Sequence, residues 1–100
     1  MDYYVVMKNW RIIFRIHAIQ RMFTRQISDE NVRYALDKGE VIENYPNDTP
    51  YPSRLLLGWI GSRPLHVVVA ENSEQMEQII ITAYEPNPDQ WEEGFKKRKV

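Results

Sequence analysis

The sequence predicts an α+β fold in which two N-terminal helices and a C-terminal helix pack on one face of an antiparallel sheet of about four strands. Two observations predict it. Apolar residues recur with helical spacing near both ends of the chain, whereas four segments rich in β-branched residues follow one another between them. The chain has 100 residues, enough for one small core, so we expect a single domain over residues 1–100.

The first helix is expected over about residues 17–26. Its inward face would consist of four apolar residues, Ala18, Ile19, Met22 and Phe23. The second helix is expected from the N-cap Ser28 to Lys38, with two carboxylates in its first turn. Gly39 follows directly and is predicted to end this helix in the left-handed conformation.

Strands are expected where β-branched and aromatic residues cluster between turn residues. These segments are residues 41–45, 54–60, 65–70 and 78–84, with residues 11–16 as a further edge strand that leads into the first helix. Residues 3–7 are apolar without a clear period, which leaves helix and strand open. Near the other end, Trp91 and Phe95 stand four positions apart, so we expect a C-terminal helix over residues 89–99.

The composition excludes several classes of protein. The chain has no cysteine, so it forms no disulfide and no thiolate metal site, which fits a reducing compartment. It shows no signal-peptide pattern and no apolar run near the roughly 20 residues that a membrane span needs. We therefore expect a soluble, cytoplasmic protein without a membrane contact.

The charges of the chain are unevenly distributed, although the formal net charge is only −1. Residues 8–28 contain five lysines and arginines and no acid, whereas residues 37–48 contain four acids and one lysine. The basic segment could attract an anion such as phosphate, although paired surface charges would give the same count.

Within this basic segment His17, Arg21 and Arg25 stand four residues apart. On a helix this spacing puts all three on one side. Adjacent cations repel each other, and a bound phosphate would relieve that repulsion. An ordinary solvent-exposed helix surface, with acids nearby, is the alternative interpretation.

A second group of polar residues is expected on the sheet. Strand alternation places His66 on one face of its strand, and Thr82 and Tyr84 together on one face of another. If the opposite faces pack on the helices, these three side chains line a partly open sheet face, with Arg54 and Arg63 at its rim. Half-buried polar residues satisfied by local hydrogen bonds are the alternative.

Other chemistries lack the residues that they need. The two histidines are far apart in the sequence, which argues against a transition-metal site, and no glycine-rich phosphate loop is present. What remains is a site of histidine, arginine and tyrosine. That set suits phosphodiester cleavage by general acid–base catalysis, with arginines stabilising the charge on phosphorus.

Several motifs occur together and in order, namely HAIQRMFTRQIS, YPNDTPYPS, RPLHVVVA and IIITAYEPNPDQW. Through them the chain resembles, from about residue 11 to residue 98, the bacterial family called domain of unknown function 4258. Many members of that family look like small toxins of the RelE-like and barnase-like ribonuclease group. They are often encoded beside a small zinc-finger antitoxin that is similar to the partner of the motility quorum-sensing regulator toxin.

This resemblance implies the toxin component of a type II toxin–antitoxin system, with RNA as substrate and a zinc-finger protein as partner. It implies a metal-independent endoribonuclease that needs no cofactor; a homodimer remains open. The candidate catalytic residues are His17, Arg21, Arg25, His66 and Tyr84. The candidate RNA-binding residues are Arg54, Arg63 and Thr82.

In this hypothesis His17 moves the proton of a ribose 2′-hydroxyl while the arginines hold the phosphate. His17 lies on a helix and His66 on the sheet, so the two groups cooperate only if the first helix begins at the sheet edge. A non-catalytic RNA- or protein-binding module is the main alternative. A purely structural domain, whose histidines and arginines pair with the acids of the middle segment, is another.

Overall fold

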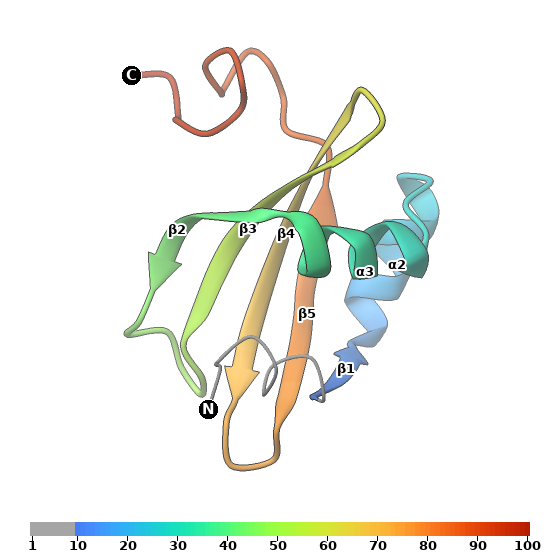
Figure 1. The fold of residues 1–100 in the computed structure, drawn as a ribbon, viewed down its shortest axis with the longest axis vertical. Helices are drawn as coiled ribbons and strands as arrows, with labels where there is room; N and C mark the ends of the chain where they lie inside the picture. Colours follow the sequence, from blue (N-terminus) through green and yellow to red (C-terminus); the bar gives the residue numbers. More distant parts are fainter. Residues whose placement is uncertain (1–9) are drawn as a thin grey trace.

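The computed structural model describes residues 10–100. The apolar stretch at residues 3–7, for which helix and strand were both open, lies outside the described residues. The described chain forms two helices and a five-stranded sheet with the strand order β1-β5-β4-β3-β2 (Figure 1). The strands are β1 (Arg11–Phe14), β2 (Glu40–Tyr45), β3 (Ser53–Ile60), β4 (Arg63–Asn72) and β5 (Glu77–Tyr84).

The sheet is mixed, and the prediction of an antiparallel sheet of about four strands was wrong. Strands β2 to β5 do form an antiparallel meander, but β1 adds a fifth strand that runs parallel to β5, with Arg11 opposite Glu77. A parallel neighbour cannot be joined by a hairpin. The chain reaches this pairing only after both helices and three other strands, so nothing in the local pattern of residues 11–14 reveals its partner.

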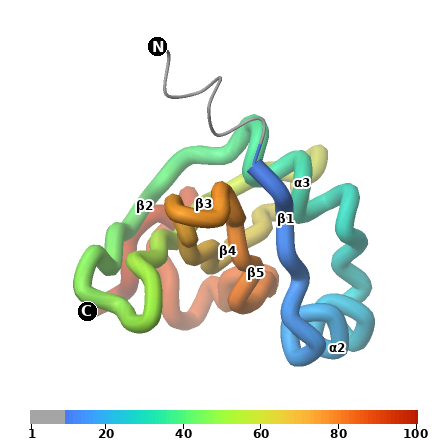
Figure 2. Tube along the Cα trace, turned by 90° about the horizontal axis from the view of Figure 1, so that it is seen from below, coloured from blue at the N-terminus to red at the C-terminus, as the bar shows by residue number. Residues whose placement is uncertain are grey.

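The two helices pack against different parts of the sheet. Helix α2 (Ile16–Thr24) follows β1 directly and contacts β5, whereas α3 (Asp29–Lys38) contacts β3 and β4. Figure 2 shows α3 over one side of the sheet and α2 beside the edge formed by β1 and β5. Both helices contribute to one buried cluster with the sheet, and its buried members from the helices and their connection are Ala18, Met22, Ile27, Val32 and Ala35.

Helix α2 buries a narrower face than the sequence predicts. Ala18 and Met22 are buried as expected, but Ile19 and Phe23 are exposed. The reason is the position of the helix beside the β1–β5 edge of the sheet, where only one side of it can contact β5. The first helix thus lies at the expected residues and at the sheet edge, with two of its four predicted core residues in solvent.

Helix α3 begins at the predicted N-cap. The Ser28 hydroxyl accepts a hydrogen bond from the Asn31 amide at 3.0 Å, and the Asn31 side chain accepts one from the Ser28 amide at 3.0 Å. This reciprocal capping box satisfies two backbone donors that a helix start leaves unpaired. The boundaries Asp29–Lys38 confirm the predicted second helix.

Gly39 ends α3 for a reason other than the predicted one. Its backbone is extended, with φ of −75°, and not left-handed. A Cβ atom at this position would lie 2.4 Å from the Ala35 carbonyl oxygen and 2.7 Å from that of Leu57. Glycine is therefore required by the close approach of the helix end to β3, not by its own φ angle.

The predicted C-terminal helix does not form. Residues 89–99 make a compact turn in which Trp91 and Arg98 form a β-bridge, with Gly94 at φ +87° and Phe95 at φ +61°. Those left-handed angles are incompatible with a right-handed helix. The i,i+4 spacing of Trp91 and Phe95 instead serves two tertiary contacts, with His66 and with Trp59 respectively.

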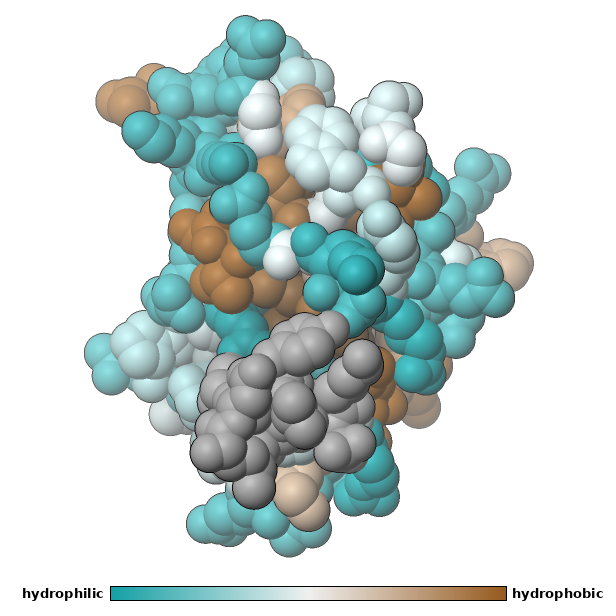
Figure 3. Space-filling model, in the orientation of Figure 1, coloured by the Kyte–Doolittle hydropathy of each residue, from teal (hydrophilic) through white to brown (hydrophobic). Residues whose placement is uncertain are grey.

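A β-bulge at Ile81 shifts the alternation of β5. Ile80 and Ala83 consequently both pack in the helix-side core, although simple alternation predicted them on opposite faces. On the other face Tyr84 lies directly opposite His66, as alternation predicted. The C-terminal turn covers part of that second face, so it is less open than the sequence suggests. In the view of Figure 3, the largest group of hydrophobic side chains lies left of the centre, and hydrophilic side chains cover much of the rest of this face.

Candidate functional site

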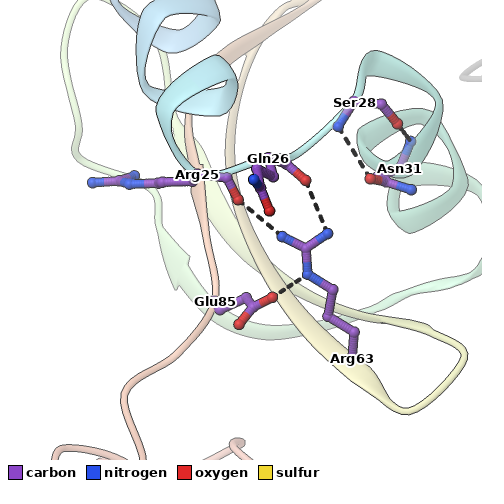
Figure 4. Close-up of polar contacts among 6 residues, drawn as sticks. All are labelled: Arg25, Gln26, Ser28, Asn31, Arg63 and Glu85. Atoms are coloured by element: carbon purple, nitrogen blue, oxygen red, sulfur yellow. Dashed lines mark hydrogen bonds and ion pairs between the residues drawn. The ribbon is translucent and has the colours of Figure 1, made fainter.

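Arg63 fastens the end of α2 to the sheet. Its guanidinium donates to the backbone carbonyls of Gln26 and Arg25, both at 3.0 Å, and forms an ion pair with Glu85 just after β5 (Figure 4). Gln26 has a left-handed φ of 58°, which turns the chain out of the helix. Because its donors hold backbone and carboxylate oxygens, Arg63 positions the site more than it offers free charge to a ligand.

Arg25 is the cation that reaches the end of β5. Its side chain points away from Arg63 in Figure 4 and donates to the Ala83 carbonyl at 2.9 Å, with the Thr82 hydroxyl at 3.4 Å. The Ala83 carbonyl needs this donor because β1 pairs only with residues 77–80 of β5. The remaining donors of the exposed Arg25 guanidinium are available to an anion.

A cleft of about 800 Å³ lies where α2, β4 and β5 end or begin. It is lined by Arg25, Gln26, Arg63, Tyr84, Glu85, Asn87 and Gln90. Pockets of several hundred cubic ångströms accommodate small ligands or single groups of larger ones. Besides the Arg63–Glu85 ion pair, the lining offers the Arg25 guanidinium, a phenol hydroxyl and three side-chain amides. These are groups that bind phosphate and the polar edges of nucleobases.

His66 packs against Tyr84, which lines the cleft, and is fully buried. Its Nε2 atom donates to the Phe95 carbonyl at 2.9 Å, since a carbonyl can only accept, which leaves Nδ1 facing the Tyr84 hydroxyl at 3.4 Å. The Trp91 ring stands edge-on to the imidazole with centroids 4.5 Å apart. Burial lowers the pKa of His66 and outweighs the Phe95 hydrogen bond, which raises it. His66 is therefore a neutral, anchored side chain.

Tyr84 connects the buried histidine with the cleft. It is half-buried, its ring packs against the His66 ring with centroids 5.3 Å apart, and it also lines the cleft. Burial raises the pKa of the phenol above its ordinary value. The hydroxyl therefore stays protonated at neutral pH. Its single proton can point to the unprotonated His66 Nδ1, 3.4 Å away, or turn from it to a bound anion.

His17 and Arg21 are exposed on α2 at four-residue spacing before Arg25, which is the C-cap residue and turns in toward β5. Neither side chain forms an ion pair within residues 10–100. We call His17, Arg21 and Arg25 the α2 ridge. His17 stands two helical turns before Arg25, about 12 Å along the helix axis. The ridge thus leads away from the cleft, and His17 is not part of the cleft lining.

Arg54 lies far from the other candidates. It pairs with Glu71, and its backbone lies opposite Val69, six residues along β4 from Arg63. Six residues of strand correspond to about 20 Å. The structure therefore brings Arg25, Arg63, Thr82 and Tyr84 together, and leaves Arg54 at the other end of the sheet.

The sequence reasoning missed four residues of the cleft, namely Gln26, Glu85, Asn87 and Gln90. The last three follow β5 in the stretch EPNPDQ, in which Pro86 and Pro88 alternate with polar residues. Prolines that alternate with polar residues directly after a candidate strand are a usable signal, because such loops hold functional side chains at the end of a sheet.

One known protein family matches the chain over a range that includes most of the cleft residues. A family model described as "Domain of unknown function (DUF4258)" matches residues 14–85. The chain belongs to this family. The DUF4258 match contains both helices, the α2 ridge and the β5 end of the cleft, whereas Asn87, Gln90 and Trp91 lie beyond it. No curated protein and no solved structure matches the chain.

Two features are absent from the described residues 10–100. Within residues 10–100, no three histidine or carboxylate side chains lie together so that they could hold a metal ion. Neither described helix has the length and apolar character to span a membrane.

Proposed function

We propose that this protein binds single-stranded RNA, with one nucleotide in the cleft and the adjoining phosphates along the α2 ridge. The observation that carries the proposal is Arg25, which belongs to both features. Its guanidinium reaches the end of β5 at Ala83, and it also ends the row that begins at His17. A cationic row that leads into a polar cleft is the arrangement that a chain of phosphates requires.

Single strands are favoured over duplexes by the lining of the cleft. Tyr84 offers part of an aromatic ring and a hydroxyl, while Asn87 and Gln90 offer amides. Amides and aromatic rings recognise unpaired bases through their polar edges and faces, which a duplex hides. The absence of acids from residues 8–28 keeps the local charge positive although the whole chain is nearly neutral.

The test is a titration of purified protein into a fluorescently labelled, unstructured RNA oligonucleotide, followed by anisotropy at low salt. Arg25→Gln is expected to weaken binding by about tenfold and to reduce the salt slope by about one. The matched control is Arg33→Gln, because Arg33 is an exposed arginine of α3 that pairs with Asp29 outside the cleft. Absence of binding by the wild type, or an equal loss in the control, would contradict the proposal.

Cleavage of the bound RNA is a second candidate function, and His17 favours it. The imidazole is exposed one helical turn from Arg21, so one phosphodiester could contact both side chains. His17 would take the 2′-hydroxyl proton while O2′ attacks phosphorus, and Arg21 would stabilise the charge that develops there. The P–O5′ bond would break to give a 2′,3′-cyclic phosphate, and the leaving 5′-oxygen would take a proton from the imidazolium or from water. This activity is the one that the toxin-like resemblance implies, with the zinc-finger protein as its proposed inhibitor. Anchored between Phe95 and Trp91, His66 has no direct role in it.

Incubation of the same RNA with protein and a chelator separates the two functions. If cleavage occurs, His17→Gln is expected to abolish it while RNA binding changes little, and expression of the wild type should slow growth more than expression of this variant. Binding without cleavage would leave the RNA-binding module as the function. Cleavage that survives in His17→Gln would exclude His17 as the proton acceptor.

A further inference from the structure

Helix α2 carries a second exposed surface that neither the fold nor the cleft uses. Ile16, Ile19 and Phe23 have exposed fractions of 71%, 50% and 86%. On a helical wheel the three lie within about 60° of one another, on the side away from the α2 ridge. We call them the α2 stripe.

The α2 stripe has the form of a docking surface. Single exposed apolar residues are ordinary, but a row at i, i+3 and i+7 is the pattern by which one helix packs on another. Nothing within residues 10–100 covers it, because α2 contacts β5 through its opposite side, at Ala18 and Met22. The stripe therefore exposes to water the kind of surface that a partner helix buries.

The charges around the stripe decide the chemistry of the partner. Arg15 is exposed directly before α2, about 40° from Ile19 around the helix, and forms no ion pair within residues 10–100. The uncharged Gln20 borders the other side, about 40° from Ile16 around the helix, and residues 8–28 contain no acid. A partner that carries carboxylates beside its apolar residues would pair with this rim.

A second copy of this chain fits the stripe poorly. Two α2 helices packed through it would bring two acid-free, basic segments together, and like charges across an interface oppose association. Three side chains also fall well short of the roughly 800 Å² per partner of a stable interface. A short helix that docks by a few anchor residues does not need such an area.

We propose that the α2 stripe docks an acidic amphipathic helix of a partner protein, with apolar residues against Ile16, Ile19 and Phe23 and carboxylates beside Arg15. This inference is independent of the proposed RNA binding, because the stripe and the cleft share no residue. It requires only that the side chains stay exposed and that the rim stays basic.

The probe is a synthetic helical peptide with leucines at i, i+3 and i+7 and glutamates at most other positions, labelled for anisotropy. A scrambled peptide of the same composition, which has no apolar stripe, is the negative probe. Wild-type protein is expected to bind the first peptide and not the second. Phe23→Ser is expected to weaken that binding by about tenfold. Tyr34→Ser is the matched control, because Tyr34 is an exposed aromatic residue on α3.

Arg15→Gln tests the charge of the rim and should weaken binding in low salt with little effect in high salt. RNA affinity measured on Phe23→Ser should equal that of the wild type, so failure of either proposal is visible separately. Equal affinity for both peptides, or an equal loss in Tyr34→Ser, would overturn the inference.

Other occupants would overturn it as well. A dimer in sedimentation that Phe23→Ser dissociates would assign the stripe to a second copy. Peptide binding that appears only after removal of residues 1–9 would assign it to that segment of the chain. Binding to anionic lipid vesicles, lost in Phe23→Ser while the peptide does not bind, would assign it to a membrane surface.

Discussion

The two histidines of this chain have opposite environments, and the difference determines what each can do. His17 is exposed on α2 and has no ion-pair partner within residues 10–100, so its imidazole is accessible to a ligand. His66 is fully buried and holds the Phe95 carbonyl through Nε2. Its neutral form is part of the native packing, so its protonation opposes folding.

Stability is therefore expected to fall in mild acid because of His66. Its pKa is lowered in the folded protein, whereas the unfolded chain has the ordinary value of about 6.5. Below that value the unfolded state binds a proton that the folded state does not, so the free energy of unfolding decreases as pH falls, until the folded-state pKa is passed. One group contributes a slope of at most about 1.4 kcal/mol per pH unit. Urea denaturation between neutral pH and pH 5 measures it.

One variant of each histidine tests whether His66 causes this pH dependence of the free energy of unfolding. His66→Gln places an amide donor near the Phe95 carbonyl without a titrating ring, so its stability should depend less on pH than that of the wild type. His17→Gln, which replaces the exposed histidine in the same way, is the matched control for the substitution. Equal slopes in the wild type and His66→Gln would contradict the assignment, whatever the absolute stability of the variants.

Among the elements, helix α3 packs very closely on β3. At Gly58 no side chain larger than a hydrogen atom fits between them. Gly58 lies under the helix, and a Cβ atom there would lie 2.7 Å from the Cβ of Ala35 and 2.9 Å from its Cα. Backbone and Cβ atoms cannot rotate away as the end of a long side chain can. The whole helix would have to move to admit one methyl group.

Gly58→Ala is accordingly expected to destabilise the protein by about 1–3 kcal/mol, the range typical of an overpacked core. Gly61→Asn is the matched control. Gly61 lies in the turn between β3 and β4 with φ +63° and no atom near its would-be Cβ, and asparagine tolerates that conformation. Thermal denaturation of both variants compares them. A smaller loss in Gly58→Ala than in Gly61→Asn would show that α3 does not rest on β3 as described.

The elements also show which parts of the fold follow from local sequence. Helix α3 could be predicted because its start is encoded nearby, in Ser28 and the residues just after it. The segment at residues 89–99 could not, because the spacing of Trp91 and Phe95 fits a helix equally well. Its turn depends on contacts with distant strands. The same holds for β1, whose parallel partner lies more than sixty residues away.

In the candidate site, too, some features follow from local sequence and others depend on distant contacts. Alternation predicted that Tyr84 would share a face with His66, and the bulge at Ile81 left this intact. Alternation carries no information about what covers a face, so the burial of His66 under Trp91 could not be anticipated. The cleft depends on Arg63 holding the carbonyls of Arg25 and Gln26, and a contact between a side chain and distant backbone has no sequence signature.

At the scale of the whole molecule, the sheet is covered on both faces by different means. The helices cover one face, and the C-terminal turn covers part of the other. After β5 the chain crosses toward the β2 side (Figure 1), where Lys96 pairs with Glu40 at 3.0 Å and Arg98 with Glu43 at 3.5 Å. Trp91 is only 2% exposed, and its ring contacts the Arg98 guanidinium at 4.6 Å and the His66 ring of β4 at 4.5 Å. The turn thus completes the second side of the core.

Trp91 is expected to be the side chain that holds this layer in place. Trp91→Ala removes a buried ring that contacts the His66 imidazole, and the loss of stability should be about 3–5 kcal/mol. Trp59→Ala is the control, since Trp59 is 42% exposed and should cost clearly less. If Trp91→Ala does not fold, Trp91→Phe should give an intermediate loss of stability.

The pKa of His66 is a second readout of the same contact. In Trp91→Ala, proton NMR should show the His66 pKa rising toward 6.5, because water would replace the ring that excluded it. Equal losses in the two tryptophan variants, with an unchanged His66 pKa, would mean that the C-terminal turn lies on the sheet without contributing to its core.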